Sequence, residues 1–326
     1  MAVVAGIDEA GYGPVLGPLL VSVAAFELPE ACLDADLWKL LTGTVTRKPN
    51  RRAGTLAIGD SKKLFHRKRP NALEHLERGV LAMLATRGVH VSSLRQLLGV
   101  LSPGAADRLG DYPWYERADV TLPHCISATD AALAGNALSA AMAAAGVRLT
   151  AMRSEVILVG EYNRTVRATH NKSNTLFDVN SRLFAYLWGK LWQAGSPGTV
   201  RLCVDRHGGR IHYLRGLQRV FSGCDFRVLG ESQACSGYWI SDRRRAMEMR
   251  FGVEFDQLHL PVALASMVSK YLRELFMELL NRYWAAQVAD LAPTAGYYAD
   301  GKRFLADIDP AVSKLALDRG LLERCR

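Results

Sequence analysis

The chain has 326 residues, 49% of them hydrophobic, and a formal net charge of +9 at pH 7. This apolar content supports a full core and excludes a disordered chain, and the length suits one domain that carries an insertion. Lys and Arg gather in separate clusters, which favours a polyanionic partner, although solvated basic loops would give the same composition. The clusters lie at residues 47–52, 62–69 and 243–245.

Targeting signals are not visible in the sequence. Asp8 and Glu9 interrupt the only apolar segment that could begin a signal peptide. The Ala-rich residues 131–147 are short and flanked by Asp130, which favours a packed helix over a membrane span. The six cysteines are scattered without a CxxC pair, as expected of reduced thiols. We therefore expect a cytoplasmic protein without membrane contact.

The first half of the chain predicts two strands followed by mostly helical segments. Two antiparallel strands are expected before residue 28, then a helix at 31–41 and a basic loop at 42–59. Asp60 or Ser61 is a good N-cap for the next helix. Helical signals continue from about residue 80 to 150, and one helix there is expected to begin near Ser127 and to end at Gly146.

The second half alternates between strand and helix patterns. Strands are expected at 155–159, 200–204, 226–229 and 247–255, and helices at 174–192, 213–221 and 261–284. A hairpin followed by strands separated by helices predicts an α/β fold with a mixed central sheet. We expect a single domain that covers residues 1–326.

Carboxylates occur where several of these elements end. Asp8 and Glu9 end the first strand, Asp205 ends the strand at 200–204, and Glu274 lies inside the long helix. Carboxylates at the carboxyl ends of neighbouring strands converge in α/β sheets, and an all-oxygen cluster suits Mg²⁺ or Mn²⁺.

Each of these residues also has a simpler interpretation. Neighbouring strand residues point to opposite faces, so Asp8 and Glu9 share a site only if the backbone bends. Asp205 would also serve as an ordinary turn residue, and Glu274 as a helical partner of Lys270.

Five motifs follow one another along the chain. They are Gly-Ile-Asp-Glu-Ala-Gly-Tyr-Gly-Pro-Val-Leu-Gly-Pro at 6–18, Gly-Asp-Ser-Lys-Lys-Leu at 59–64, Val-Asp at 204–205, Ala-Ser-Met-Val-Ser-Lys-Tyr-Leu-Arg-Glu at 265–274 and Gly-Tyr-Tyr at 296–298. In this order they resemble the type 2 ribonucleases H, the ribonucleases HII and HIII. The resemblance implies a ribonuclease H-like fold, with an inserted, mainly helical segment at about 65–154.

The chain departs from this family at several positions. Tyr12 stands between two glycines where the family usually has Arg or Lys, so a cation is lost from the expected phosphate path. Asp205 is followed by Arg206 and His207 instead of glycine, and His207 is a candidate proton shuttle or a solvated loop residue. Glu274, where ribonucleases HII have Asp, resembles the HIII version.

The resemblance implies an endonuclease that cuts the RNA strand of RNA/DNA hybrids, or at embedded ribonucleotides, and leaves 5′-phosphate and 3′-hydroxyl ends. Asp8, Glu9, Asp205 and Glu274 would be the catalytic residues and would hold two divalent ions, Mg²⁺ or Mn²⁺, about 3.5–4 Å apart. The nucleic-acid-binding residues would be Gly11, Tyr12, Gly13, Lys62, Lys63, Lys270 and Tyr297. The family default is a monomer.

Two other functions fit the same residues. A structure-selective DNA nuclease would keep the metal site and use the insertion as a substrate clamp. A non-catalytic nucleic-acid-binding protein would have a decayed site, yet none of the four carboxylates has been lost.

Overall fold

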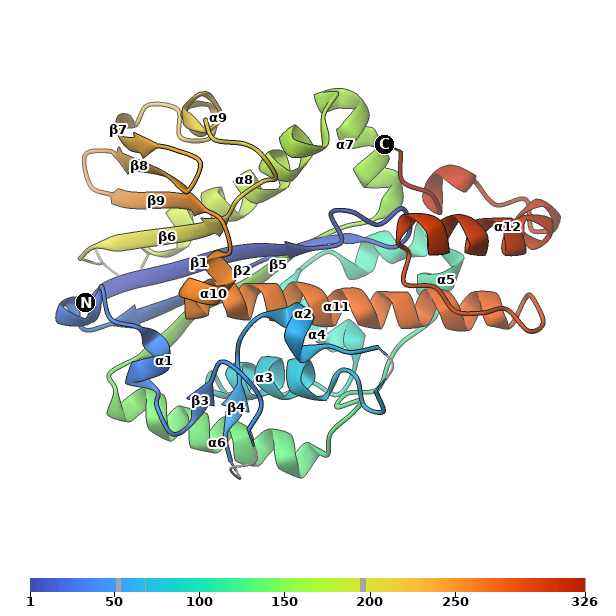
Figure 1. The fold of residues 1–326 in the computed structure, drawn as a ribbon, viewed down its shortest axis with the longest axis horizontal. Helices are drawn as coiled ribbons and strands as arrows, with labels where there is room; N and C mark the ends of the chain where they lie inside the picture. The colour runs from blue at the N-terminus through green and yellow to red at the C-terminus, as the bar shows by residue number, and fades with distance from the viewer. Residues whose placement is uncertain (51–53, 68, 194–197, 326) are drawn as a thin grey trace.

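The computed structural model describes residues 1–50, 54–67, 69–193 and 198–325, so Arg51, Arg52 and Lys68 of the basic clusters lie outside it. Over these residues, one mixed sheet has the strand order β5-β2-β1-β6-β9-β8-β7 (Figure 1). Its strands are β1 (Ala2–Ala10), β2 (Leu19–Leu28), β5 (Arg148–Ile157), β6 (Val200–Asp205), β7 (Asp225–Glu231), β8 (Cys235–Ser241) and β9 (Ala246–Gly252).

The pairing around β1 fixes where the strands end. β1 is antiparallel to β2 and parallel to β6, and β6 is parallel to β9. The carboxyl ends of β1, β6 and β9 therefore point to the same edge of the sheet. The expected initial hairpin and the mixed α/β sheet are confirmed.

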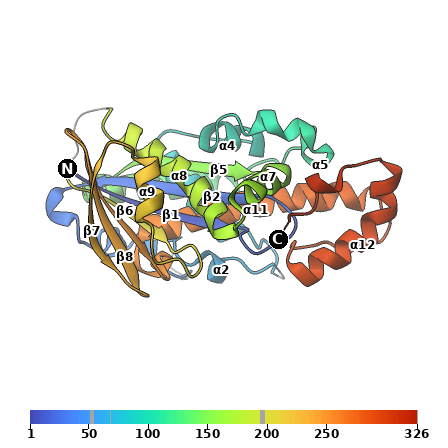
Figure 2. The ribbon, with the colours of Figure 1, turned by 90° about the horizontal axis from the view of Figure 1, so that it is seen from above.

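Helices cover both faces of the sheet. On one face lie α7 (Val159–Thr169), α8 (Lys172–Lys190) and α9 (Leu214–Val220), as the view from above shows (Figure 2). On the other face α11 (Leu260–Ala285) runs along β1 and β2. It approaches so closely that a Cβ on Gly6 would lie 2.1 Å from the backbone nitrogen of Val262. This contact sets α11 directly behind the carboxyl end of β1.

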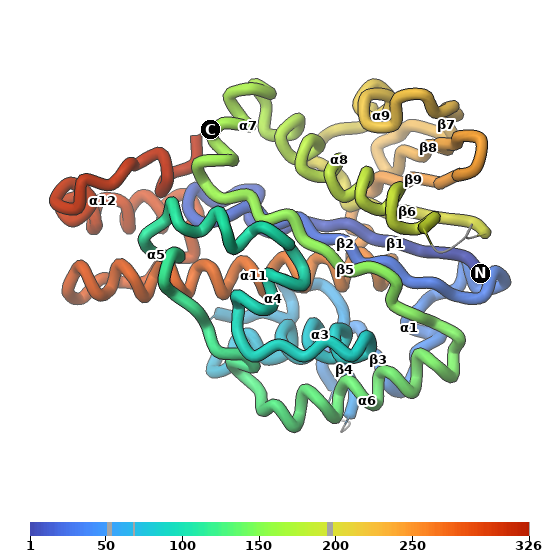
Figure 3. The backbone as a smooth tube through the Cα atoms, turned by 180° about the vertical axis from the view of Figure 1, so that it is seen from behind, coloured from blue at the N-terminus to red at the C-terminus, as the bar shows by residue number. Residues whose placement is uncertain are grey.

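The segment predicted as an insertion lies beyond α11 and contains α3 (Glu74–Ala85), α4 (Leu94–Leu101), α5 (Pro113–Glu116) and α6 (Ala128–Ala144). Helix α3 contacts both α6 and α11 (Figure 3). Ser127 caps α6 by accepting a hydrogen bond from the amide of Asp130, as its sequence predicts. Within the described residues, no helix has the length and apolar character needed to cross a membrane.

Several elements differ from the sequence prediction. The helix expected at 31–41 is reduced to the turn η1 (Glu30–Cys32) and α1 (Leu37–Leu40). The loop at 42–59 contains the short pair β3 (Val45–Thr46) and β4 (Leu56–Ala57). Strand β5 begins inside the expected insertion, and α7, β8, α10 (Phe255–Leu258) and α12 (Tyr298–Lys314) were not predicted.

Candidate active site

A cleft of about 580 Å³ opens at the edge where β1, β6 and β9 end. It is lined by the end of β1 and the turn after it, the start of α2 (Ser61–Leu64), the segment between β9 and α11, and α11 itself. The lining residues are Asp8, Glu9, Ala10, Gly11, Tyr12, Gly13, Pro14, Asp60, Ser61, Lys62, Asp205, Val253, Glu254, Asp256, Gln257, Ser266, Lys270, Arg273 and Tyr297.

Asp8 and Glu9 both line the cleft although they are neighbours on one strand. Pairing of β1 with β6 stops at Ile7, whereas pairing with β2 continues to Ala10. Beyond Ile7 the edge of β1 that faced β6 therefore has no strand partner among the described residues, and the cleft that both side chains line opens there. The backbone amide of Glu9 also donates a 2.7 Å hydrogen bond to the Asp8 carboxylate.

Asp205 completes a group of repelling carboxylates with these two residues. Burial, together with the charges of Glu9 and Asp205, raises the pKa of Asp8 well above its usual value. Burial and the charge of Asp205 raise the pKa of Glu9 to about 7. The pKa of Asp205 itself rises to about 6, chiefly through burial, although the amide of Phe255 donates a 3.1 Å hydrogen bond to it.

Asp256 is a cleft carboxylate that the sequence analysis missed. It belongs to α10, which follows β9, and it lies close enough to Asp205 for its charge to raise the pKa of that residue. Its own pKa is raised by burial and by Asp60. The strand-end rule could have found Asp256, because it directly follows the strand predicted at 247–255; the structure ends β9 at Gly252 and places Asp256 in the short helix α10.

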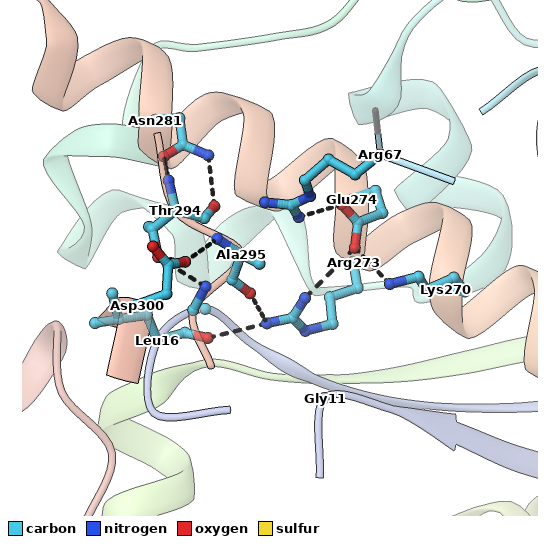
Figure 4. Close-up of polar contacts among 12 residues, drawn as sticks. Gly11, Leu16, Arg67, Lys270, Arg273, Glu274, Asn281, Thr294, Ala295 and Asp300 are labelled. Atoms are coloured by element: carbon cyan, nitrogen blue, oxygen red, sulfur yellow. Dashed lines mark hydrogen bonds and ion pairs between the residues drawn. The ribbon is translucent and has the colours of Figure 1, made fainter. Parts of the chain in front are cut away.

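Glu274, by contrast, is not among the described residues that line the cleft. Its carboxylate pairs with Lys270 at 2.7 Å, with Arg67 at 2.7 Å and with Arg273 at 3.5 Å (Figure 4). Although burial opposes the effect, Lys270, Arg67 and Arg273 hold the pKa of Glu274 below its usual value. Glu274 is thus engaged by three cations, of which Lys270 and Arg273 line the cleft.

The expected nucleic-acid-binding residues lie around this carboxylate group. Six of the seven line the cleft: Gly11, Tyr12, Gly13, Lys62, Lys270 and Tyr297. Lys63 does not line it; its ammonium pairs with Asp60 at 3.1 Å, and its side chain is 61% exposed. The ring of Tyr297 is 54% exposed.

His207 is neither solvated nor available as a proton shuttle. Its side chain is fully buried against the rings of Phe177, Tyr213 and Phe251. Neither ring nitrogen has a hydrogen-bond partner among the described residues, and burial lowers the pKa of the imidazole to about 3. The loop after Asp205 turns into the core, which no local sequence pattern predicts.

The donor chemistry of the cleft can be compared with the needs of a metal ion. Within the described residues, no group of three or more His, Cys, Asp and Glu side chains is arranged to hold one. The chemistry of the carboxylates nevertheless suits hard divalent ions, because all donors are oxygens and several repel one another. None of Asp8, Glu9, Asp205 and Asp256 forms an ion pair with a described basic residue, whereas Glu274 forms three. These four carboxylates thus have no ion-pair partner among the described residues, although the charge of Lys62 acts on Glu9, Asp205 and Asp256.

Comparison with known proteins gives matches only among solved structures, since no protein-family model and no curated sequence matches. Ribonuclease H2 from Pyrococcus horikoshii OT3 is 13% identical, with a TM-score of 0.40 over 98% of this chain and 92% of that one. RNase HII from Archaeoglobus fulgidus, solved in a complex with PCNA, is 14% identical, with a TM-score of 0.43 over 99% and 94%. Bst-RNase HIII in complex with Mn²⁺ is 14% identical, with a TM-score of 0.42 over 99% and 66%. These are members of the family that the motifs resemble.

Proposed function

We propose that this chain is a metal-dependent endonuclease that hydrolyses the RNA strand of RNA/DNA hybrids, or cuts at ribonucleotides embedded in a duplex. The observation that carries the proposal is the group of carboxylates at the ends of β1, β6 and β9, which repel one another and form no ion pair with a described basic residue, in a cleft that Lys62 and Lys270 also line. A negative centre beside cations suits a phosphodiester whose charge is shared between metal ions and basic side chains.

Asp8, Glu9 and Asp205, with Asp256 in place of Glu274, would hold two divalent ions, Mg²⁺ or Mn²⁺. When bound, such ions activate water and stabilise the leaving oxygen of an in-line displacement. The four carboxylates contribute a formal charge of about −4, which two divalent ions balance.

The other cleft residues would bind the substrate. Lys62 and Lys270 would contact phosphates, which gives affinity without sequence preference. The backbone of residues 11–13 and the exposed ring of Tyr297 face the same cleft and are candidates for contacting the 2′-hydroxyl that distinguishes RNA from DNA. We further expect a monomer that acts in the cytoplasm.

The test is a cleavage assay with labelled RNA/DNA hybrid, all-DNA duplex and a duplex holding one ribonucleotide. Each substrate is incubated with Mg²⁺, with Mn²⁺ and with chelator, using the wild-type chain and Asp8→Asn. Asp107→Asn, an exposed carboxylate in η2 (Ala106–Asp111) outside the cleft, is the matched control. We expect metal-dependent cutting of the RNA strand only, lost in Asp8→Asn and kept in Asp107→Asn.

The remaining outcomes separate the alternatives. Cutting of all-DNA duplexes would move the function to a DNA nuclease. Binding without cleavage in either metal would support a non-catalytic nucleic-acid-binding protein. Cleavage that persists in chelator would contradict the metal-dependent mechanism.

A further inference from the structure

The turn that joins β1 to β2, residues 11–18, is held from behind by two buried arginines. It begins and ends with glycines of positive φ, Gly11 at 90° and Gly17 at 76°. Four of its residues, Gly11, Tyr12, Gly13 and Pro14, line the cleft. Its shape therefore decides which backbone groups face the substrate, and the arginines contact its carbonyl oxygens.

Arg324 links the two ends of this turn. Its guanidinium donates from Nη1 to the carbonyl of Gly11 and from Nε to the carbonyl of Gly17, the latter at 2.8 Å. Its backbone amide donates to the carbonyl of Val15 at 2.9 Å, and Glu323 forms a β-bridge with Leu16. The segment around Arg324 thus follows the turn along its length.

The same segment is anchored on the other side to α7. The side-chain amide of Asn163 donates to the carbonyls of Gly320 and Glu323, at 3.0 and 2.9 Å. The amide of Cys325 donates to the side-chain oxygen of Asn163 at 2.7 Å. Movement of Arg324 would therefore break a network that α7 holds in place.

Arg273 holds the opposite side of the turn and joins it to Tyr297. Its Nη2 donates to the carbonyls of Leu16 and Ala295, at 3.2 and 3.1 Å (Figure 4). The carbonyl of Gly296 accepts from the amide of Val15 at 2.8 Å. Residues 11–13 and Tyr297, which come from distant parts of the chain, are thereby fixed relative to each other.

Burying the charged guanidinium of Arg324 costs free energy, so its contacts must offset the lost hydration. Its side chain is 3% exposed, and among the described residues it has no carboxylate partner. Burial and, to a smaller extent, the positive charge of Arg273 lower the pKa of the Arg324 guanidinium to about 9. Among the described residues, backbone carbonyls, the ring of Tyr162, whose centroid lies 4.7 Å away, and Tyr115 offset the charge. A guanidinium can reach both ends of the turn because its donors form a planar fork, which an ammonium lacks.

We propose that Arg324 is a positioning residue, which holds the cleft turn of residues 11–18 in the shape that contacts the substrate backbone. The role in catalysis rests on the proposed function, but the effect on the turn does not. Arg324 lies outside the cleft lining and touches no proposed metal ligand, so it acts through Gly11 and Gly17.

The first test is hydrogen exchange in Arg324→Met and Arg324→Lys, measured by mass spectrometry on peptides that cover residues 11–18. We expect faster exchange there in both variants, with unchanged exchange in β6 and in the middle of α11. Arg319→Met is the matched control, since Arg319 lies on the same segment, pairs with Asp309 and is 61% exposed in its side chain. Unchanged exchange at residues 11–18 would overturn the proposal.

The second test is cleavage kinetics of the same variants. A misplaced turn should lower kcat by about tenfold or more, with a smaller change in KM. Added guanidinium ion, at concentrations that leave the wild-type chain folded, should restore part of kcat in an Arg324→Ala variant. Altered exchange with unchanged kcat would overturn the positioning role.

These outcomes are distinguishable from failure of the proposed function. If the wild-type chain cuts none of the substrates while exchange at residues 11–18 responds to Arg324, the turn is held as proposed and the nuclease assignment fails. If Arg324→Met does not fold, Arg324→Lys carries both tests, because its ammonium keeps the charge but cannot bond both Gly11 and Gly17.

Discussion

Asp256 and Glu274 lie on consecutive helices, yet only Asp256 has no basic partner among the described residues. We predict that Asp256→Asn lowers cleavage by roughly 100-fold or more and weakens Mn²⁺ binding, since it removes a proposed ligand. Glu274→Gln should lower cleavage by about tenfold and leave Mn²⁺ affinity unchanged, because it loosens Lys270 and Arg67 without touching the metal. Calorimetric Mn²⁺ titration checks both predictions. A larger loss of Mn²⁺ affinity in Glu274→Gln than in Asp256→Asn would mean that Glu274 is a metal ligand.

We predict that the stability of the folded chain depends on pH through His259, the residue that precedes α11. Burial and the nearby guanidiniums of Arg250 and Arg201 lower the pKa of its imidazole to about 4. As the pH falls from about 6.5 to 4, His259 becomes protonated in the unfolded chain but stays neutral in the folded chain. The folded state therefore loses stability over this range.

The comparison for this prediction is His259→Asn, which is neutral and a good N-cap. Urea unfolding from pH 8 to pH 4 should show a smaller loss of stability in His259→Asn than in the wild-type chain. Equal losses in the two proteins would mean that His259 does not contribute.

The sequence placed Asp8, Glu9 and Asp205 at strand ends because a carboxylate after an apolar run marks such an end, and all three line the cleft. Glu274 was expected beside them but is not among the described lining residues, because the sequence does not reveal which side of a long helix faces a cleft. The burial of His207 depends on aromatic residues from α8, α9 and β9, which no local pattern connects.

At the scale of elements, Glu77 of α3 joins the helical segment to α11. Its carboxylate accepts hydrogen bonds from the amides of His124, Cys125 and Ile126, at 2.6, 2.6 and 3.0 Å. It also accepts one from the hydroxyl of Tyr271 at 2.6 Å, and the side chain is fully buried. The loop before α6 is thus fixed to the helix that lies behind the cleft.

We predict that Glu77→Ala lowers the free energy of unfolding by about 3 to 5 kcal/mol, because it leaves buried amides without acceptors. Glu77→Gln should cost less, since the amide oxygen still accepts. Glu74→Ala, an exposed residue one turn earlier, is the control for helix propensity. A loss below 1 kcal/mol in Glu77→Ala, measured by urea unfolding, would contradict this role.

The elements that the sequence missed have physical explanations. Strand β8 contains two serines and a glycine, so its propensity is low, and it forms because β7 and β9 flank it. Helix α7 follows β5 after a single residue, and no Gly or Pro separates the two patterns. Its end is set by His170 in the left-handed conformation, which is uncommon outside glycine and asparagine.

At the scale of the whole molecule, the charge of +9 predicts binding that weakens with salt. If Lys62 contacts one phosphate, Lys62→Gln should reduce the slope of log K against log salt by about 0.9. Lys63→Gln should change the slope little, because Lys63 is not among the described residues that line the cleft and its ammonium is already paired with Asp60. Fluorescence anisotropy at several salt concentrations measures the slope, and equal changes in the two variants would mean that Lys63 also contacts phosphate.

The contact between Arg324 and Gly11 spans 313 positions of the chain. The strands on either side of the turn after β1 can pair locally, but the turn cannot reach its final form until the distant residue that links its ends has packed against it. A folding chain should therefore pair β1 with β2 early and complete the cleft late. In the proposed nuclease, activity should return during refolding only after the β1–β2 hairpin has formed.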